Sequence, residues 1–145
     1  MPYDYEAYFA DPKKLKYWKD KRTVDEKYLA PMILPDAFTL NAGAGLFVEQ
    51  SILNLKKVTC VDISHTAINE LKKKKINAVR ADLRDMWPFK TNEFEQVLLL
   101  DIFEHLGQVG TFLNELNRVT KPNARIIVGL PLLNHWRNKL KLLMG

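Results

Sequence analysis

The chain has 145 residues, of which 47% are apolar and 27% charged, a composition that predicts one soluble globular domain with a real core. No apolar run is long enough to span a bilayer, the first residues show no signal-peptide pattern, and the single cysteine excludes a disulfide framework, so we expect a cytoplasmic protein. The net charge of +5 would suit nucleic acid or an anionic membrane, but no RNA-binding signature accompanies it, and we do not expect a nucleic-acid partner.

The first 35 residues are predicted to form a helical cap. One or two short helices are expected within residues 3–29, where Asp11 followed by Pro12 is a plausible N-cap and first helical residue. The tyrosines of this segment could form a lid over a ligand, although ordinary packing of a helix explains them equally well. Pro31 and Pro35 then bracket a linker that leads into the first strand.

The rest of the chain alternates strands with helices. The predicted strands are residues 37–41, 58–61, 76–80, 94–100 and 125–130. Helices are predicted over 46–55, from a Ser64 cap to the lysine run 72–75, and around 112–119, with a turn at Pro122-Asn123. Alternation of this kind implies right-handed crossovers and a parallel sheet.

A glycine-rich turn between two strands is the most informative feature of the sequence. The first strand runs into Gly43 and Gly45, and the second strand ends at Asp62. Ligands of parallel sheets bind at the carboxyl ends of the strands, where glycines let the backbone approach closely. A carboxylate there can accept hydrogen bonds from both hydroxyls of a ribose, so the order predicts a nucleoside pocket. An ordinary turn role for Asp62 is the alternative.

Two phosphate-binding patterns fail at identifiable positions. The third glycine of a dinucleotide fingerprint would fall at Val48, and a P-loop would need lysine and then serine or threonine where Leu46 and Phe47 stand. S-adenosylmethionine carries a ribose but no pyrophosphate, so it does not demand these residues. A nicotinamide-dependent oxidoreductase is disfavoured because Val48 stands where the third glycine of the dinucleotide fingerprint would be.

Five motifs in the right order resemble those of class I S-adenosylmethionine-dependent methyltransferases of the type 11 group. The resemblance runs from about Phe38 to Pro131. The matching segments are Leu40-Asn41-Ala42-Gly43-Ala44-Gly45-Leu46-Phe47, Asp62, Asp82-Leu83, the run from Trp87-Pro88-Phe89 to Asp101-Ile102-Phe103-Glu104-His105, and residues 115–124.

The resemblance implies a Rossmann-like three-layer α/β/α sandwich with a mostly parallel sheet in the order 3-2-1-4-5, whose residues 36–131 form a cofactor-binding core. It implies S-adenosyl-L-methionine as cofactor and S-adenosyl-L-homocysteine as product. Asp62 would hold the ribose and Asp82 the adenine amino group. The alternative for Asp82 is a surface salt bridge, since Arg80, Arg84 and Asp85 stand near it in the sequence. The implied cofactor-binding residues are Asn41, Ala42, Gly43, Ala44, Gly45, Asp62, Ile63, Asp82, Leu83 and Leu100.

Three features depart from the family pattern. Asn41 stands where the family usually has an acidic residue that helps to hold the methionine ammonium, and Phe47 replaces a small residue. The sixth and seventh strands of the family are missing, and residues 132–145 read as a basic amphipathic helix. The chain would then be a fragment, a short form, or a protein whose sheet edge a partner covers. A homo-oligomer through this edge and peripheral membrane contact through the terminal helix both stay open.

Two residues after the fourth strand are candidates for catalysis. His105 could accept a proton near neutral pH, or it could simply support the start of the next helix. Asp101 lies nearer the end of the strand and could hold the acceptor or the methionine end of the cofactor. The histidines are separated by whole structural units, so no metal site is predicted.

These observations predict an S-adenosylmethionine-dependent methyltransferase that acts on a small-molecule or lipid-like acceptor. The alternative is a catalytically weak or inactive methyltransferase-like fragment or binding module that acts through cofactor or partner binding.

Overall fold

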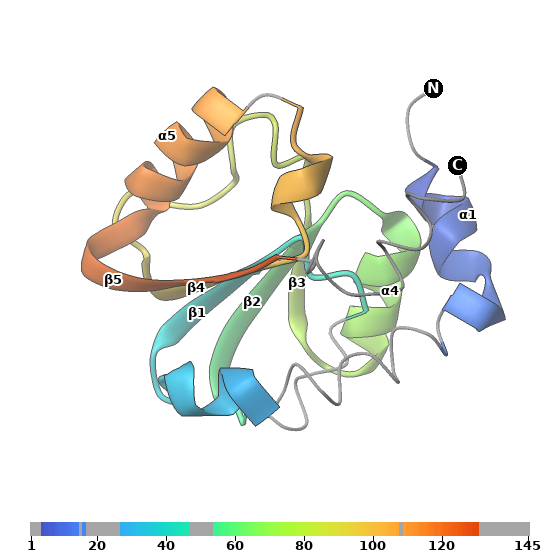
Figure 1. Cartoon of the computed structure of the whole chain (residues 1–145), viewed down its shortest axis with the longest axis horizontal. Coiled ribbons are helices and arrows are strands. Elements are labelled where there is room, and N and C mark those ends of the chain that lie inside the picture. The colour runs from blue at the N-terminus through green and yellow to red at the C-terminus, as the bar shows by residue number, and fades with distance from the viewer. Residues whose placement is uncertain (1–3, 15, 17–26, 47–53, 108, 131–145) are drawn as a thin grey trace, which may run out of the picture.

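The computed structural model describes residues 4–14, 16, 27–46, 54–107 and 109–130. The strands are β1 (Phe38–Ala42), β2 (Lys57–Asp62), β3 (Asn77–Arg80), β4 (Phe94–Leu100) and β5 (Thr120–Gly129). They pair in parallel in the order β3-β2-β1-β4-β5 (Figure 1). The described helices are α1 (Tyr5–Ala10), α4 (His65–Lys73) and α5 (Val109–Val119), with single 3₁₀ turns η1 (Ala30–Met32) and η2 (Phe103–His105).

Helices cover both faces of this sheet, and each face has its own hydrophobic core. Ile68 and Leu71 of α4 pack with Cys60 on one face. Phe112 of α5 packs with Leu40 on the other face, so α4 and α5 lie on opposite sides of the strands (Figure 1). Apolar side chains on both faces are typical of a buried parallel sheet. The arrangement confirms the predicted Rossmann-like α/β fold and its strand order.

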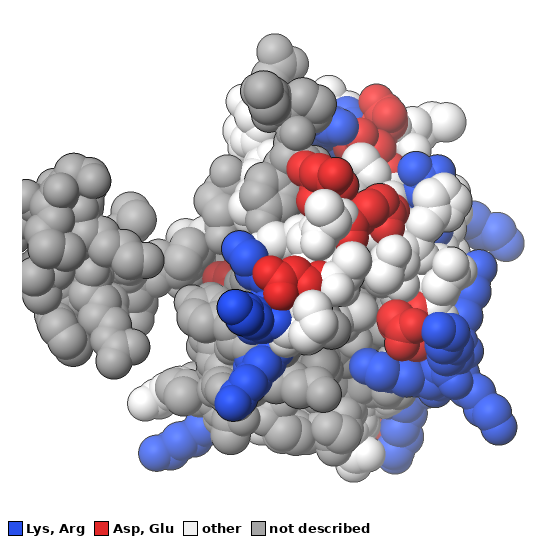
Figure 2. Space-filling model, turned by 90° about the vertical axis from the view of Figure 1, so that its right-hand side faces the viewer, with Lys and Arg blue, Asp and Glu red and all other residues white. Residues whose placement is uncertain are grey.

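The α4 helix begins and ends where the sequence predicts. The Ser64 side chain accepts a hydrogen bond from the backbone N–H of Ala67 at 3.2 Å, which makes it the N-cap. The helix ends within the lysine run 72–75, whose four side chains are exposed, as expected for cations at a helix C-terminus. Figure 2 shows the side of the molecule that carries α1 and α4, where basic side chains gather toward the lower edge and acidic ones lie above them.

The start of β5 differs from the prediction. We expected Pro122-Asn123 to form a turn before a strand over 125–130, but β5 already begins at Thr120. Asn123 takes a left-handed backbone conformation with φ +64°, and the pairing register shifts between Phe94 and Gln96 on β4. Two steps along β4 oppose five along β5, so three extra residues of β5 leave the ladder here. A bulge on a strand at the edge of the described sheet tolerates proline and asparagine.

Other predicted elements are only partly within the described residues. The helix over 46–55 lies mostly outside them, and Phe47 and residues 132–145 lie wholly outside them. In the amino-terminal segment, Asp11 accepts a hydrogen bond from the backbone N–H of Lys13 at 2.8 Å, and helical residues begin again at Pro12, as predicted. Among the described helices, none is long and apolar enough to cross a membrane.

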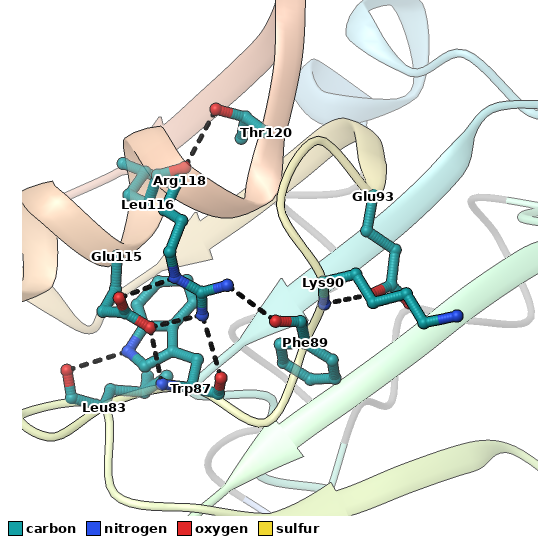
Figure 3. A network of polar contacts seen from close by, with 9 residues as sticks. All are labelled: Leu83, Trp87, Phe89, Lys90, Glu93, Glu115, Leu116, Arg118 and Thr120. Atoms are coloured by element: carbon teal, nitrogen blue, oxygen red, sulfur yellow. Dashed lines mark hydrogen bonds and ion pairs between the residues drawn. The ribbon is translucent and has the colours of Figure 1, made fainter.

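A buried polar network attaches the segment between β3 and β4 to α5 (Figure 3). The Arg118 guanidinium donates to the backbone carbonyls of Phe89 and Trp87 at 2.7 and 2.9 Å, and it pairs with Glu115 at 2.6 Å. Glu115 also accepts the Trp87 backbone N–H at 2.7 Å. The Trp87 indole N–H in turn donates to the carbonyl of Leu83 at 3.1 Å. We call Trp87, Glu115 and Arg118 the clamp.

Candidate functional site

A pocket opens where the chain leaves the carboxyl ends of the strands. Four segments that follow β1, β2, β3 and β4 line it together with one residue of α1, as a parallel sheet with this strand order leads us to expect. We call it the strand-end pocket. Its lining residues are Tyr5, Gly43, Asp62, Ile63, Ala81, Asp82, Leu83, Arg84, Ile102, His105 and Leu106.

The glycine turn after β1 forms one wall of the pocket. Gly43 and Gly45 both have left-handed backbone conformations, with φ +73° and +51°. The backbone N–H groups of Gly43 and Ala44 donate to the carbonyl of Val61 at 2.9 and 3.0 Å, which holds the turn against β2. A Cβ atom at Gly43 would lie 2.6 Å from Cδ1 of Ile102. The position therefore requires glycine for its dihedral angle and for its space.

Asp62 stands opposite this turn at the end of β2, and it is only 7% exposed. Its Oδ2 accepts the backbone N–H of Gly45 at 2.8 Å, and its Oδ1 accepts that of Ser64 at 2.9 Å. Burial raises the pKa of Asp62, and the hydrogen bonds from Ser64 and Gly45 oppose the rise. Each carboxylate oxygen keeps capacity for a further donor, so the group can accept two hydroxyls of a ligand.

Asn41 supplies a second polar group near the turn. Its side chain is 2% exposed and makes no hydrogen bond within the described part of the chain. Buried amides are normally paired, since an unpaired one costs roughly 1–3 kcal/mol. A ligand that brings a hydrogen-bonding group to the end of β1 would satisfy it. A buried carboxylate, a glycine turn and an amide without a partner among the described residues thus lie near the ends of β1 and β2.

Asp82 lines the pocket and is paired at the same time. The Arg84 guanidinium contacts it at 2.5 Å from Nη2 to Oδ2, and Nε donates to both carboxylate oxygens at 2.9 and 3.1 Å. The hydrogen bond from Arg84 lowers the pKa of Asp82. The salt bridge considered as an alternative for Asp82 is therefore present, yet the residue still faces the pocket. Its contact with an adenine amino group stays a prediction.

The two catalytic candidates are placed differently. His105 ends η2 and lines the pocket, where its ring meets the edge of the Tyr5 ring with 6.3 Å between centroids. Asp101 follows β4 with φ +52°, and its backbone N–H donates to the carbonyl of Gly129 at 3.0 Å. It is not among the residues that line the pocket. Both catalytic roles stay predictions.

Only some of the residues predicted to bind the cofactor line the pocket. Of the residues expected to bind cofactor, Gly43, Asp62, Ile63, Asp82 and Leu83 line it. The others are not lining residues: Asn41, Ala42, Ala44, Gly45 and Leu100. Ala42 packs on the α5 side of the sheet and Leu100 on the α4 side, while Gly45 acts through its bond to Asp62.

Five lining residues were not among the predicted site residues, namely Tyr5, Ala81, Arg84, Ile102 and Leu106. Four of them adjoin predicted positions, because Ala81 precedes Asp82, Arg84 follows Leu83, Ile102 follows Asp101, and Leu106 follows His105. Proximity to a motif could have indicated these four. Tyr5 lies 38 residues before Gly43, and it is one of the tyrosines for which a lid over a ligand was one of two interpretations. Within the described residues, no group of three or more His, Cys, Asp or Glu side chains could hold a metal ion.

Comparisons with solved structures find the same fold in several proteins. A protein from Pyrococcus horikoshii superposes with a TM-score of 0.72 and 21% identity, over 86% of this chain and 63% of that one. An S-adenosylmethionine-dependent methyltransferase from Thermotoga maritima gives 0.68 and 18%, over 82% and 56%. A Haloferax volcanii methyltransferase, solved in complex with a methyltransferase activator, gives 0.69 and 16%, over 82% and 56%. At these identities the structures establish a shared fold, and the chain spans 56–63% of their lengths.

No curated protein sequence matched the chain. Its sequence does match a family of methyltransferase domains over residues 39–128, which is more than half of its length. The match begins in β1 and ends in β5, so it contains the glycine turn, Asp62 and Asp82. A methyltransferase domain of this family implies S-adenosylmethionine as the cofactor. The chain belongs to the methyltransferase domain family.

Proposed function

We propose that this chain binds S-adenosylmethionine in the strand-end pocket and transfers a methyl group to a small-molecule or lipid-like acceptor. The observation that carries the proposal is the buried Asp62 carboxylate across from the Gly43 turn, with one backbone N–H on each oxygen. When bound, the cofactor supplies a sulfonium methyl group that a nucleophile can displace in line. The protein then contributes mainly by holding the two reactants in position.

The residues have separate roles in this proposal. Asp62 accepts hydrogen bonds from the two ribose hydroxyls. Leu83 packs beside the adenine, and Asp82 accepts its amino group while it remains paired with Arg84. Asn41 accepts a hydrogen bond from the amino-acid end of the ligand, because its buried amide has no partner among the described residues.

The acceptor would enter near His105 and Leu106. Both line the pocket on the segment after β4, next to Tyr5 of α1. The apolar side chains of Leu106 and Ile102 would favour a ligand with a hydrophobic part. If the acceptor must lose a proton, we propose the imidazole of His105, which lines the pocket, as the general base. Asp101, which follows β4 and is not a lining residue, would hold the acceptor or the methionine end of the cofactor.

Calorimetry with S-adenosylmethionine, S-adenosylhomocysteine and NAD tests the proposal. We expect binding of the first two and none of NAD. Asp62→Ala should weaken binding of S-adenosylhomocysteine by about 1.5–3 kcal/mol, the usual contribution of hydrogen bonds to a charged group. Asp36→Ala is the matched control, because Asp36 is exposed, lies before β1 and pairs with Lys56 rather than lining the pocket.

An Asp62→Ala variant that binds as tightly as the wild type would contradict the proposed site. Binding of S-adenosylhomocysteine without methyl transfer to any tested small molecule or lipid would favour the alternative, a binding module of the methyltransferase fold. The substitution of an acidic residue by Asn41 is the feature that supports this alternative.

A further inference from the structure

The short helix α1 is attached to α4 by one carboxylate. Glu6 accepts hydrogen bonds from the Ser64 hydroxyl at 3.0 Å and from the backbone N–H groups of His65 and Thr66 at 2.6 and 3.1 Å. These N–H groups belong to the first turn of α4, where a helix leaves its donors without intrahelical partners and where negative charge is favourable. The contact joins residues 58–60 positions apart in the sequence.

Hydrophobic burial in α1 is incomplete, with Tyr5, Tyr8 and Phe9 only partly buried. The helix has six residues, and none of them is fully buried. It also caps itself locally, since Asp4 accepts the backbone N–H of Ala7 at 3.0 Å. The polar contact through Glu6 is therefore an attachment of α1 to the core that acts beside these partly buried rings.

Ser64 continues this contact into the strand-end pocket. Its hydroxyl donates to Glu6 while it accepts the Ala67 N–H as N-cap of α4. Its own backbone N–H donates to Oδ1 of Asp62 at 2.9 Å. Ser64 is almost completely buried, so its position is fixed by these bonds. A continuous chain of hydrogen bonds thus leads from Glu6 through Ser64 to Asp62, and from Asp62 to the backbone of Gly45.

The attachment also places the aromatic side chains of α1 at the site. Tyr5 directly precedes Glu6, lines the pocket and contacts the edge of His105. Burial raises the pKa of Tyr5, and the negative charges of Asp62 and Asp82 add to the rise. On the next turn of the helix, the Phe9 ring approaches the glycine turn so closely that a Cβ atom at Gly45 would lie 3.2 Å from it.

We propose that Glu6 is a positioning residue of the ligand site, which orients Asp62 through Ser64 and holds Tyr5 against the pocket without lining it. The inference rests on the proposed function, because it assigns Asp62 to the ribose. In this proposal, α1 contributes to ligand binding as well as to the fold. A residue outside the matched segment 39–128 then contributes to recognition of the nucleoside.

The experiment compares Glu6→Ala, Glu6→Gln and Asp62→Ala by titration with S-adenosylhomocysteine, adenosine and 2′,3′-dideoxyadenosine, which lacks the ribose hydroxyls. Glu6→Ala should weaken binding of S-adenosylhomocysteine about two- to tenfold, the effect of one ordinary hydrogen bond. It should also reduce the preference for adenosine over the dideoxy compound, toward the value of Asp62→Ala. Glu6→Gln keeps an acceptor oxygen, so it should recover part of both losses.

Glu70→Gln is the matched control, because Glu70 is a carboxylate on α4 that contacts Lys73 instead of α1. It should bind all three ligands like the wild type. Unchanged affinity in Glu6→Ala beside a weakened Asp62→Ala would overturn this inference and leave the proposed function intact. Weaker binding with an unchanged preference for adenosine would also overturn it, since Glu6 would then only support the fold. Unchanged binding in Asp62→Ala would overturn the proposed function and this inference together.

Discussion

Gly43 meets two requirements that no other residue type meets together. Its φ of +73° costs an L-residue roughly 1–2 kcal/mol, and a Cβ atom there would press on Ile102. We expect Gly43→Ala to lose at least about this amount of unfolding free energy, measured by urea denaturation, and to bind S-adenosylhomocysteine more weakly. Gly110→Ala is the control, because Gly110 lies in α5 with nothing within 4 Å of an added Cβ.

The control should be neutral or gain roughly 0.5–1 kcal/mol, since alanine is the better helix former. Equal stability of the two variants would show that the turn accepts a side chain, which would remove the argument for a glycine cradle.

The Glu6 carboxylate makes the contact between α1 and α4 depend on pH. Hydrogen bonds from Thr66, His65 and Ser64 lower the pKa of Glu6 to about 2, from an ordinary value of 4.5. A lowered carboxyl pKa means that the contact contributes fully above about pH 4.5 and is lost as the pH falls toward 2. Because the side chain is exposed, water and salt screen the effect. In an NMR titration, we expect the backbone amides of His65 and Thr66 to shift with a midpoint near 2. A midpoint near 4.5 would mean that α1 is not held by this carboxylate.

Among the elements, the clamp attaches to α5 the segment between β3 and β4, which forms one wall of the pocket. Arg118 and Lys73 form a useful pair of test sites, because each pairs with a glutamate three residues earlier at 2.6 Å. The side chains of Arg118 and Glu115 are 29% and 11% exposed, whereas those of Lys73 and Glu70 are 72% and 42% exposed. Only Arg118 also satisfies two backbone carbonyls.

We therefore expect Arg118→Met to lower the denaturation midpoint several times more than Lys73→Met, whose exposed pair contributes little. Ligand affinity should fall as well in Arg118→Met, since the clamp fixes Trp87 and, through its indole N–H, the carbonyl of Leu83. An equal decrease of the denaturation midpoint in both variants would show that burial and the two carbonyl contacts of Arg118 add no stability beyond that of an exposed ion pair.

The elements also show where sequence patterns succeed and fail. Apolar periodicity and caps predicted the strands and α4, because these depend on residues close together in the chain. The bulge at Asn123 was missed, because proline and asparagine usually indicate a turn. The sequence does not show that this segment pairs with β4 and so continues as a strand. The contact of Glu6 with α4 has no local pattern at all, because it depends on how two distant segments meet.

For the whole molecule, the parallel α/β sheet followed from the alternation of strands and helices, and its strand order followed from the family resemblance. Gly43 and Asp82 come after strands and Asp62 ends one, and a parallel sheet brings such positions to one edge. The sequence could not decide between the alternatives for two other side chains of the pocket, because the local geometry of these segments depends on the fold. Tyr5 from α1 lines the pocket, and Arg84 pairs with Asp82.

β5 is an edge strand of the described sheet, which leads to a prediction about self-association. Within the described residues β5 pairs only with β4, and Ile126 and Val128 are about half exposed. Exposed apolar strands at a sheet edge promote association between chains. We expect self-association that increases with concentration in sedimentation velocity, and Val128→Lys should shift it toward the monomer. A wild-type protein that stays monomeric across the concentration range would contradict a homo-oligomer through this edge.

The single thiol of the chain, Cys60, lies fully enclosed in the α4-side core, and burial raises its pKa to about 12. At neutral pH it is thus almost free of thiolate, the form that reacts with maleimides. A cysteine introduced on the surface of α1, for example at Ala10, would accept a fluorescent dye without background labelling of the native protein. Movement of that helix during ligand binding could then be followed directly by optical spectroscopy.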